Sequence, residues 1–288
     1  NQKYFEHNYL GTDSIDKTKR TSIKNTIGIA LQEGFNKWAK AGLTAFLSYE
    51  YRNFALTDTT NIPGQRIINN YKESSLSIGG ELSKKQGKLL HYNILGELAI
   101  AGEDAGQFSV EGRGDLNLRL FGDTVRLDVN AFIKNQNPVF YFRHFQSKHY
   151  WWDNNDLSKI MRTRLEGKLS LDRWGTQLRA GVENIKNYTY LANTSIPVKD
   201  SEGNVTGFKN NAAVRQHSGN IQIFTAMLQQ KLKVGIFHLD GEVAYQKSSE
   251  QDILPLPELS AYGNLYMKFG LAKKVLQIEI GRASCRER

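Results

Sequence analysis

Residues 124–135 read Thr-Val-Arg-Leu-Asp-Val-Asn-Ala-Phe-Ile-Lys-Asn, and apolar and polar side chains alternate along them. The odd positions hold Val125, Leu127, Val129, Ala131 and Ile133, and the even positions include Arg126, Asp128, Asn130 and Lys134. A period of two is that of a β-strand whose faces meet different surroundings. The stretch therefore predicts a strand with one apolar face and one charged face.

The same alternation recurs along most of the chain, for example at residues 37–52, 90–100 and 161–169. It predicts twelve strands, over residues 22–33, 37–55, 70–84, 88–101, 107–121, 124–135, 158–172, 175–187, 219–232, 235–247, 258–272 and 274–280. Most of these are about twice as long as the ~5–6 residues usual in soluble sheets.

The predicted connections alternate between short and long. Short turns are expected at 34–36, 85–87, 122–123, 173–174, 233–234 and 273, and longer loops at 56–69, 102–106, 136–157, 188–218 and 248–257. Consecutive antiparallel strands would place all the short turns at one end of the sheet and all the long loops at the other. Tight periplasmic turns, long external loops and strands of at least ~9–11 residues are typical of outer-membrane barrels. A soluble antiparallel sheet with one wet face would explain the alternation, but neither the strand length nor the loop sorting.

The prediction is therefore an all-β fold, an antiparallel up-and-down transmembrane β-barrel. About twelve strands lie in this chain, and the intact barrel is expected to be larger.

Composition alone would suggest a different class. The 288 residues are 40% hydrophobic and 23% charged, with a mean hydropathy of −0.50, values typical of a soluble protein of one or two domains. No apolar run approaches the ~18 residues of a membrane-spanning helix, which excludes a helical membrane protein. The 14 Phe, 13 Tyr and 5 Pro favour strands over disorder.

The two ends of the chain suggest a fragment. It begins at Asn1 without an initiator methionine, and residues 279–288 resemble the translation of a sequencing adapter. We interpret 1–278 as part of a single outer-membrane barrel domain and 279–288 as a non-native tail. Cys285, the single cysteine, lies in that tail, so no disulfide is expected.

In a barrel the apolar face contacts lipid and the charged face lines a watery lumen. The charged face of four consecutive predicted strands carries more cations than anions. The predicted basic wall is Arg113, Arg119, Arg126, Lys134, Arg162, Arg164, Lys168 and Arg179, and its acidic members are Glu111, Asp115, Asp128, Glu166 and Glu183. Basic pore linings favour anions, but the charges could equally form cross-strand ion pairs that hold a hydrated wall together. The net charge of +9 does not indicate nucleic-acid binding, because the cations alternate with lipid-facing residues.

Aromatic residues form two predicted groups. Candidates for the girdles at the membrane interfaces are Tyr49, Tyr51, Phe54, Tyr92, Tyr245, Tyr262 and Phe269. Some of these are expected to face the lumen or to lie in the middle of the membrane instead. The loop cluster Tyr150, Trp151 and Trp152 is too apolar to lie free in water. It could stack on sugar rings, constrict the lumen, or act as a hydrophobic plug that only pins the loop.

Motifs that carry chemistry are missing from the sequence. It has no nucleophile elbow, P-loop, Cys-x-x-Cys pair or zinc-binding helix motif, so we predict no catalytic residues, metal or cofactor. His144 and His149 share a loop without a zinc-like spacing. Asp153 to Asp156 could supply oxygen ligands to calcium or bond their own backbone. The glycines of Gly112-Arg113-Gly114 are expected to permit close strand packing rather than to bind phosphate.

Two stretches carry a family resemblance. Asn137-Pro138-Val139-Phe140-Tyr141-Phe142 leads to Ser147-Lys148-His149-Tyr150-Trp151-Trp152-Asp153-Asn154-Asn155, and Leu254-Pro255-Leu256-Pro257 opens a late strand. With them the chain resembles the putative porin family of the Bacteroidetes outer membrane. The resemblance implies a pore in the outer membrane and, since the members are longer, strands missing on both sides.

The functional hypothesis is an outer-membrane channel for passive diffusion of small hydrophilic solutes, with a weak preference for anions. The alternatives are the barrel of a TonB-dependent active importer, an outer-membrane enzyme of the phospholipase or protease kind, for which no Ser-His or Asp-His set is found, and a soluble surface adhesin. Expected partners are outer-membrane lipid, lipopolysaccharide and the solutes, with a homo-oligomer left open.

Overall fold

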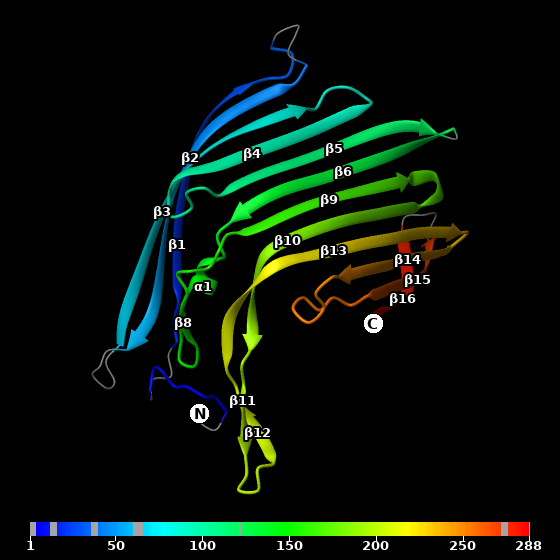
Figure 1. Cartoon of the computed structure of the whole chain (residues 1–288). Coiled ribbons are helices and arrows are strands. Elements are labelled where there is room, and N and C mark those ends of the chain that lie inside the picture. Colours follow the sequence, from blue (N-terminus) through cyan, green and yellow to red (C-terminus); the bar gives the residue numbers. More distant parts are fainter. Residues whose placement is uncertain are drawn as a thin grey trace.

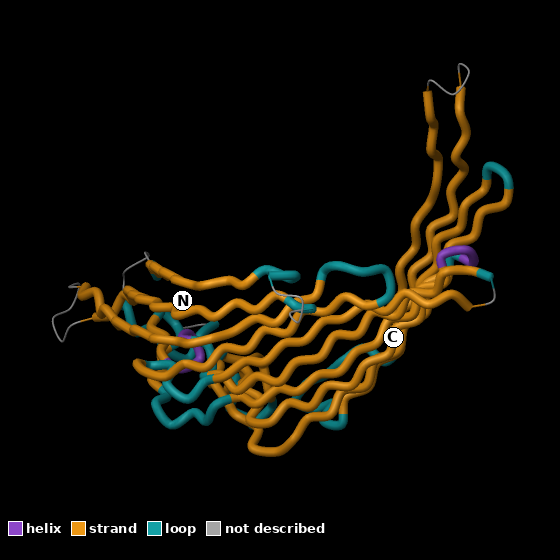
Figure 2. The backbone as a smooth tube through the Cα atoms, turned by 90° about the horizontal axis from the view of Figure 1, so that it is seen from above, coloured by secondary structure: helices purple, strands orange, loops and turns teal. Residues whose placement is uncertain are grey.

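A computed structural model describes residues 4–11, 16–35, 40–59, 66–120, 122–271 and 276–287. Twelve long strands form one antiparallel sheet in which each strand pairs with its neighbour along the chain, apart from small elements inserted in the loops. The strands are β1 (Lys19–Leu31), β2 (Gly42–Thr59), β3 (Arg66–Lys84), β4 (Leu90–Gly102), β5 (Phe108–Leu120), β6 (Asp123–Gln136), β9 (Ile160–Leu171), β10 (Thr176–Asn193), β13 (Ala212–Val234), β14 (Phe237–Ser248), β15 (Leu259–Leu271) and β16 (Leu276–Glu287). The predicted fold class is confirmed, and the sheet curves like the wall of a barrel (Figure 1, Figure 2).

Each predicted strand is present, but several boundaries were wrong. Residues 56–69 were expected to be a loop, whereas β2 and β3 continue through most of this range, with Thr57 paired to Ile68. Much of the predicted loop 188–218 likewise belongs to β10 and β13, which pair out to Asn193 and Ala212. Backbone pairing needs no apolar face, so a hairpin can continue after the amphipathic pattern ends.

The turns follow the predicted sorting in part. The short connections at 85–89, 172–175 and 235–236 lie at one end of the sheet, and the long ones at 137–159, 194–211 and 249–258 lie at the other. The first turn was expected at 34–36, but β1 ends at Leu31 and β2 begins at Gly42; residues 36–39 lie outside the described part of the chain. The turn predicted at Lys273 also lies outside the described residues.

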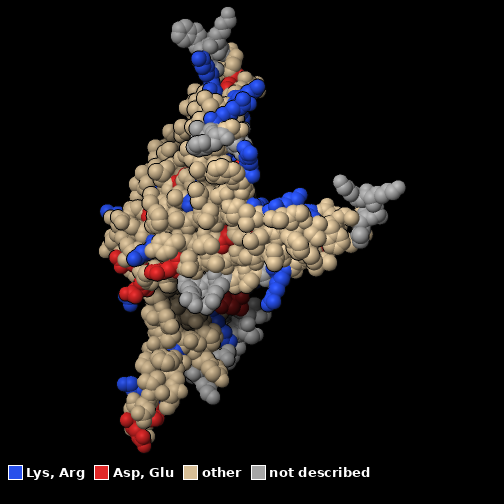
Figure 3. Space-filling view, turned by 90° about the vertical axis from the view of Figure 1, so that its right-hand side faces the viewer, with Lys and Arg blue, Asp and Glu red and all other residues tan. Residues whose placement is uncertain are grey.

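The two faces of the sheet differ as the alternation predicts. Leu127 pairs with Leu116 and Leu169 across three strands, while Asp128 pairs with Asp115 and Lys168. Large apolar side chains on the outer face are exposed, among them Leu98, Leu165 and Val182. Such exposure is expected of a face that contacts lipid. In a soluble β-sandwich the apolar faces of the two sheets pack together and are buried. The space-filling view shows wide areas of surface without charged side chains (Figure 3).

Two of the girdle candidates lie on the inner face, an outcome that the prediction allowed for some of them. Phe54 pairs with Tyr71 on the inner face and is only 4% exposed, because a loop packs over it. Tyr262 pairs with Glu242 on the inner face as well. Tyr49 and Tyr245 are exposed on the outer face, and their place in an interfacial girdle stays a prediction.

The glycine expectation was wrong for Gly112. A Cβ atom there would meet nothing closer than 4.0 Å, so close packing does not demand glycine at this position.

The loops at the end opposite the short turns contain further structure. One holds helix α1 (Phe140–Arg143) and the short strands β7 (His144–Gln146) and β8 (Trp151–Asp153); another holds the hairpin of β11 (Ile196–Lys199) and β12 (Val205–Lys209). At the β11–β12 turn, backbone N–H groups led by that of Asn204 hold the pKa of the Asp200 carboxyl below its ordinary value. None of the described helices is long and apolar enough to cross a membrane.

The N-terminal segment 4–11 joins these two loops. The N–H of Tyr9 donates to the carbonyl of Lys148 (2.8 Å), and that of Asn210 donates to the carbonyl of Tyr4 (2.8 Å). The Phe5 ring stacks on the His149 ring at 3.9 Å. Segment 4–11 therefore ties loop 137–159 to loop 194–211 beyond the strand ends.

The sheet is open within the described residues, with β1 and β16 at its edges. Strand β16 pairs with β15 as far as Glu287, although 279–288 were expected to be a non-native tail. Backbone pairing accepts almost any sequence, so that expectation stays a prediction, as does the single domain over 1–278. The register puts Arg282 opposite Leu265, on the outer, apolar side.

Candidate functional site

The inner face of the sheet gathers the charged residues of β5, β6, β9 and β10. Glu111, Phe132, Arg164 and Glu183 follow one another across these strands, and Asp115, Asp128, Lys168 and Arg179 form a second row. The predicted basic wall and its acidic members therefore share one surface.

Most of these charges form ion pairs between strands. Lys134 Nζ lies 2.7 Å from Glu111 Oε1, and Lys168 Nζ lies 2.9 Å from Asp128 Oδ2. Arg162 Nε donates to Glu183 at 2.8 Å, and Arg164 pairs with Glu166 on its own strand. Arg126 and Arg179 approach Asp128 and Glu166 at 3.7 and 3.9 Å. The geometry supports the interpretation of a wall held together by ion pairs.

Two members of the wall differ from the others. Arg113 and Arg119 are exposed and form no ion pair within the described part of the chain. Their charge is therefore the least neutralised of the basic wall.

The acidic counterpart of the basic wall lies on β1–β4 and was missed from the sequence. Its inner-face charges are Arg20, Lys24, Glu50, Arg52, Asp58, Glu73, Glu81 and Glu97, three cations and five anions. These strands alternate with the same period of two as the others, so the sequence carries the signal for their inner-face charges.

The connection between β6 and β9, residues 137–159, folds back against the inner face of the protruding β2–β3 hairpin; we call it the inserted loop. The ring of Phe140 stacks on Phe54 (3.7 Å between centroids, 4° between planes) and meets Tyr71 edge-on. Phe54, Leu56 and Phe140 form a buried apolar cluster. The inserted loop is thereby anchored at the outer mouth of the sheet.

A buried ion chain fixes the same loop to the wall. Arg143 Nη1 lies 2.8 Å from Glu103 Oε1 and its Nη2 lies 2.7 Å from Glu73 Oε1. Glu73 also meets Arg52 (3.1 Å), which pairs with Asp104 at 2.6 Å. Glu73 is 7% exposed. The ion chain Glu103–Arg143–Glu73–Arg52–Asp104 joins β2, β3, the β4–β5 loop and the inserted loop.

The predicted aromatic cluster of this loop is split. Trp152 stacks on Phe145 (4.9 Å), and its Nε1–H donates to the carbonyl of Tyr141 (2.9 Å). Tyr150 meets Phe5 edge-on, whereas Trp151 is 45% exposed. Trp152 thus has the contacts of a residue that pins the loop.

The polar residues of the loop are engaged within it. His144 Nδ1 lies 2.6 Å from Asp153 Oδ1, and the Asn154 side chain donates to the carbonyl of Phe142 (3.0 Å). His149 Nδ1 donates to the carbonyl of His7 at 2.9 Å, apart from His144. Over the described ranges, no group of three or more His, Cys, Asp or Glu residues is placed to hold a metal ion.

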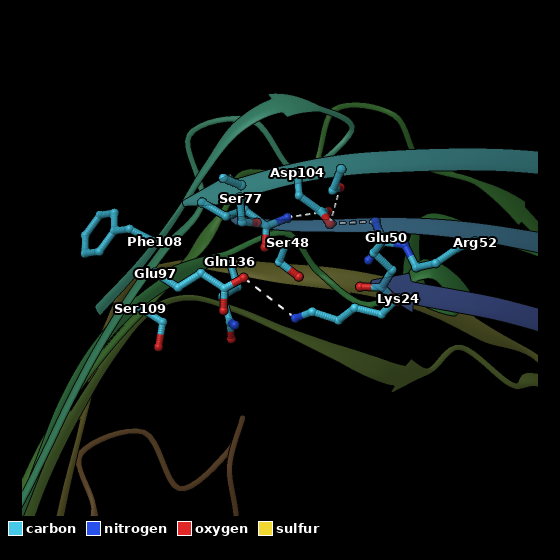
Figure 4. A pocket seen from close by; sticks show the side chains of 13 residues that line it. Lys24, Ser48, Glu50, Arg52, Ser77, Glu97, Asp104, Phe108, Ser109 and Gln136 are labelled. Atoms are coloured by element: carbon cyan, nitrogen blue, oxygen red, sulfur yellow. Dashed lines mark hydrogen bonds and ion pairs between the residues drawn. The ribbon is translucent and has the colours of Figure 1, made fainter. Parts of the chain in front are cut away.

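A polar cavity opens on the inner face beside the ion chain (Figure 4). Its volume is about 220 Å³, and residues of β1 to β6 line it. Lys24 reaches across it toward Glu97 (3.7 Å), while the Phe108 ring turns away from the polar groups (Figure 4). A larger cavity near the short turns, about 570 Å³, is lined by residues that include Lys84, Lys85 and Arg113.

Comparison with known proteins yields a family and a fold. A family model described as "Putative porin" matches residues 1–284. No curated protein sequence matches the chain. The crystal structure of the siderophore receptor PirA from Pseudomonas aeruginosa is similar, with a TM-score of 0.60 and 10% sequence identity. The similarity covers 95% of this chain and 50% of the receptor chain, so the chain spans about half the receptor's length.

Proposed function

The chain belongs to the putative porin family, and from that premise we propose that it forms a passive diffusion channel for small hydrophilic solutes. It is an outer-membrane β-barrel protein of a Gram-negative type. The observation that carries the proposal is the predominantly polar inner face, rich in charges and hydroxyls, behind an apolar outer face. Such a wall offers solutes a hydrated route through hydrocarbon.

The proposed ion selectivity is weak. The excess of three cations on β5–β10 is largely offset by the excess of two anions on β1–β4. Since a pore responds to the sum of its lining charges, the preference for anions should be smaller than the basic wall alone suggests.

The inserted loop supports a channel with a narrowed outer mouth. It occupies the inner face of the β2–β3 hairpin and is held by both the aromatic cluster and the ion chain. A loop fixed in this way limits the size of passing solutes without closing the barrel.

The alternative remains an active importer of the TonB-dependent kind. The two functions differ in a measurable way, because a diffusion channel conducts without an energy source, whereas a receptor plugged by a separate domain does not.

The test is a planar-bilayer recording of the purified protein. A channel should show stepwise conductance under an applied voltage alone, with a permeability ratio between K⁺ and Cl⁻ close to one. Absence of steps in lipid that accepts the folded protein would reject the channel in favour of a plugged receptor.

A further inference from the structure

The cavity of Figure 4 combines short hydroxyl side chains with longer charged ones. Ser48, Ser75, Ser77 and Ser109 are among its lining residues, and Lys24, Glu50 and Glu97 stand around them. Because serine is short, the wall is hollowed where these residues meet. We call this hollow the serine cradle.

Part of the lining is already engaged in hydrogen bonds. Asp104 accepts from Arg52, Ser75 and Gln107, each at 2.6 Å. Glu50 accepts from Ser22 at 2.7 Å, and Ser48 and Thr26 are hydrogen-bonded at 3.0 Å. These contacts hold the rim of the cradle in place.

Other groups are left available to a ligand. The side chains of Ser77 and Gln136 have no hydrogen-bond partner within the described residues. Lys24 spans two strands to approach Glu97, but only to 3.7 Å, and the two side chains are 50% and 31% exposed. At this distance the pair is beyond hydrogen-bond range, so both groups can turn to a solute.

The chemistry of these groups narrows the ligand. An anion would meet Glu50, Glu97 and Asp104, and a cation would meet Lys24 and Arg52. A solute with several hydroxyls both donates and accepts, so it can satisfy the carboxylates, the ammonium, the amide and the serine at once. The volume of about 220 Å³ is below the ~300–1,000 Å³ of pockets for drug-sized ligands, which suits a solute of monosaccharide size.

We propose that the serine cradle is a binding subsite for an uncharged, polyhydroxylated solute of monosaccharide size. The inference deepens the proposed channel function by naming a solute class for its lumen. Binding should be weak, because an open site on a diffusion path must release what it holds.

The experiment measures binding separately from transport. Saturation-transfer NMR with D-glucose is recorded on the protein in detergent micelles, for the parent and for Lys24→Met/Glu97→Gln. This double change removes both partners and leaves the net charge as it is. The control Lys168→Met/Asp128→Asn removes another inner-face pair outside the cradle lining. Glucose affinity should fall about tenfold in the first variant and stay within about twofold in the control.

Several results would overturn the proposal. One is the absence of a glucose signal in the parent, and another is an equal loss of glucose affinity in the two variants. A third is a stronger saturation-transfer signal from the free amino acid glycine than from glucose, which would assign the cradle to zwitterions. If the cradle variant does not fold, the second variant Ser77→Leu tests the same site. The leucine side chain fills the hollow and should abolish the glucose signal. Glucose binding without stepwise conductance would reject the channel function and support the subsite. Stepwise conductance without glucose binding would support the channel function and reject the subsite.

Discussion

Val129 and Asn130 are neighbours on β6 whose side chains belong to opposite faces. Val129 pairs with Gly114 and Gly167 on the outer face and is 38% exposed. Asn130 pairs with Arg113 and Glu166 on the inner face. Consecutive residues of β6 therefore point their side chains alternately toward lipid and toward water.

The same substitution at these two positions should have different effects. Val129→Arg places a charge toward the middle of the bilayer and should lower the free energy of unfolding by ~2–4 kcal/mol. Asn130→Arg adds its charge to a hydrated wall between Arg113 and Glu166, whose opposite charges offset each other, and should change the free energy of unfolding by less than ~0.5 kcal/mol. Denaturant titration of protein folded in lipid vesicles measures both, and equal losses would mean that the faces are misassigned.

The inserted loop is held by an aromatic cluster and by the ion chain. Arg143 is its single link in the ion chain, and it bridges Glu73 and Glu103. Both Arg143 (11% exposed) and Glu73 (7%) are withdrawn from water, so removing one charge leaves the other poorly solvated.

Arg143→Met should therefore loosen this loop. The expected loss of stability is ~2 kcal/mol, below the ~3–5 kcal/mol typical of a broken buried pair, because Arg52 still faces Glu73. Protease cleavage within 137–159 and single-channel conductance should both rise.

Arg164→Met is the matched control for this prediction. It removes a more exposed arginine of the inner wall, which is 35% exposed, and should cost less than ~1 kcal/mol with no added cleavage in 137–159. If the two variants were cleaved alike, the ion chain would not be what holds the loop.

The orientation of the hairpins gives a second prediction for elements. Gln86 lies in the turn between β3 and β4, and Ser201 lies in the turn between β11 and β12, at the opposite end of the sheet. In a Cys285→Ser background, Ser201→Cys should react with a membrane-impermeant maleimide on intact cells. Gln86→Cys should react only after the outer membrane is permeabilised, and equal labelling of the two would contradict the topology.

The strands were predictable from the sequence and the loop structure was not, for a physical reason. A period of two is imposed wherever one face meets lipid and the other water, so β6 and β9 were located to within about two residues. Phe54 shares its parity with Glu50 and Arg52, so the alternation already places it on the inner face, but its burial depends on Phe140, which is distant in sequence and packs through an irregular loop. The contacts of Arg143 with Glu73 and Glu103 join separate connections and leave no local pattern.

At the scale of the whole molecule, the inner wall contains arginines and lysines in ion pairs and arginines without an ion pair. Arg162, Arg164 and Lys168 each face a carboxylate, so their fields are partly cancelled near the wall. Arg113 and Arg119 are exposed and form no ion pair among the described residues, although Glu111 lies two residues from Arg113 on the same face of β5. Permeating ions should therefore respond more to the charges of Arg113 and Arg119 than to those of the paired residues.

Arg113→Glu/Arg119→Glu should shift the reversal potential under a salt gradient toward cations. Each substitution removes one positive and adds one negative charge, so the formal charge of the β5–β10 wall changes from +3 to −1. Folding yield should fall only slightly, because neither parent arginine forms an ion pair in the described part of the chain, although the change at Arg113 adds a like charge between Glu111 and Asp115 on the same face of β5. The shift should shrink as salt is raised, since the Debye length falls from ~10 Å at 0.1 M to ~3 Å at 1 M.

The comparison variant is Arg162→Glu/Arg164→Glu/Lys168→Glu, which reverses charges that take part in ion pairs. It distinguishes an effect of the pore's charge on selectivity from an effect of lost ion pairs on folding. It places new carboxylates beside Glu183, Glu166 and Asp128, and like charges on adjacent strands are destabilising. We expect a lower folding yield from this variant than from the pair at 113 and 119. If Arg113→Glu/Arg119→Glu conducts with unchanged selectivity, the unpaired arginines do not face the permeation path, and the selectivity of the pore is set at its outer mouth, where the inserted loop narrows it.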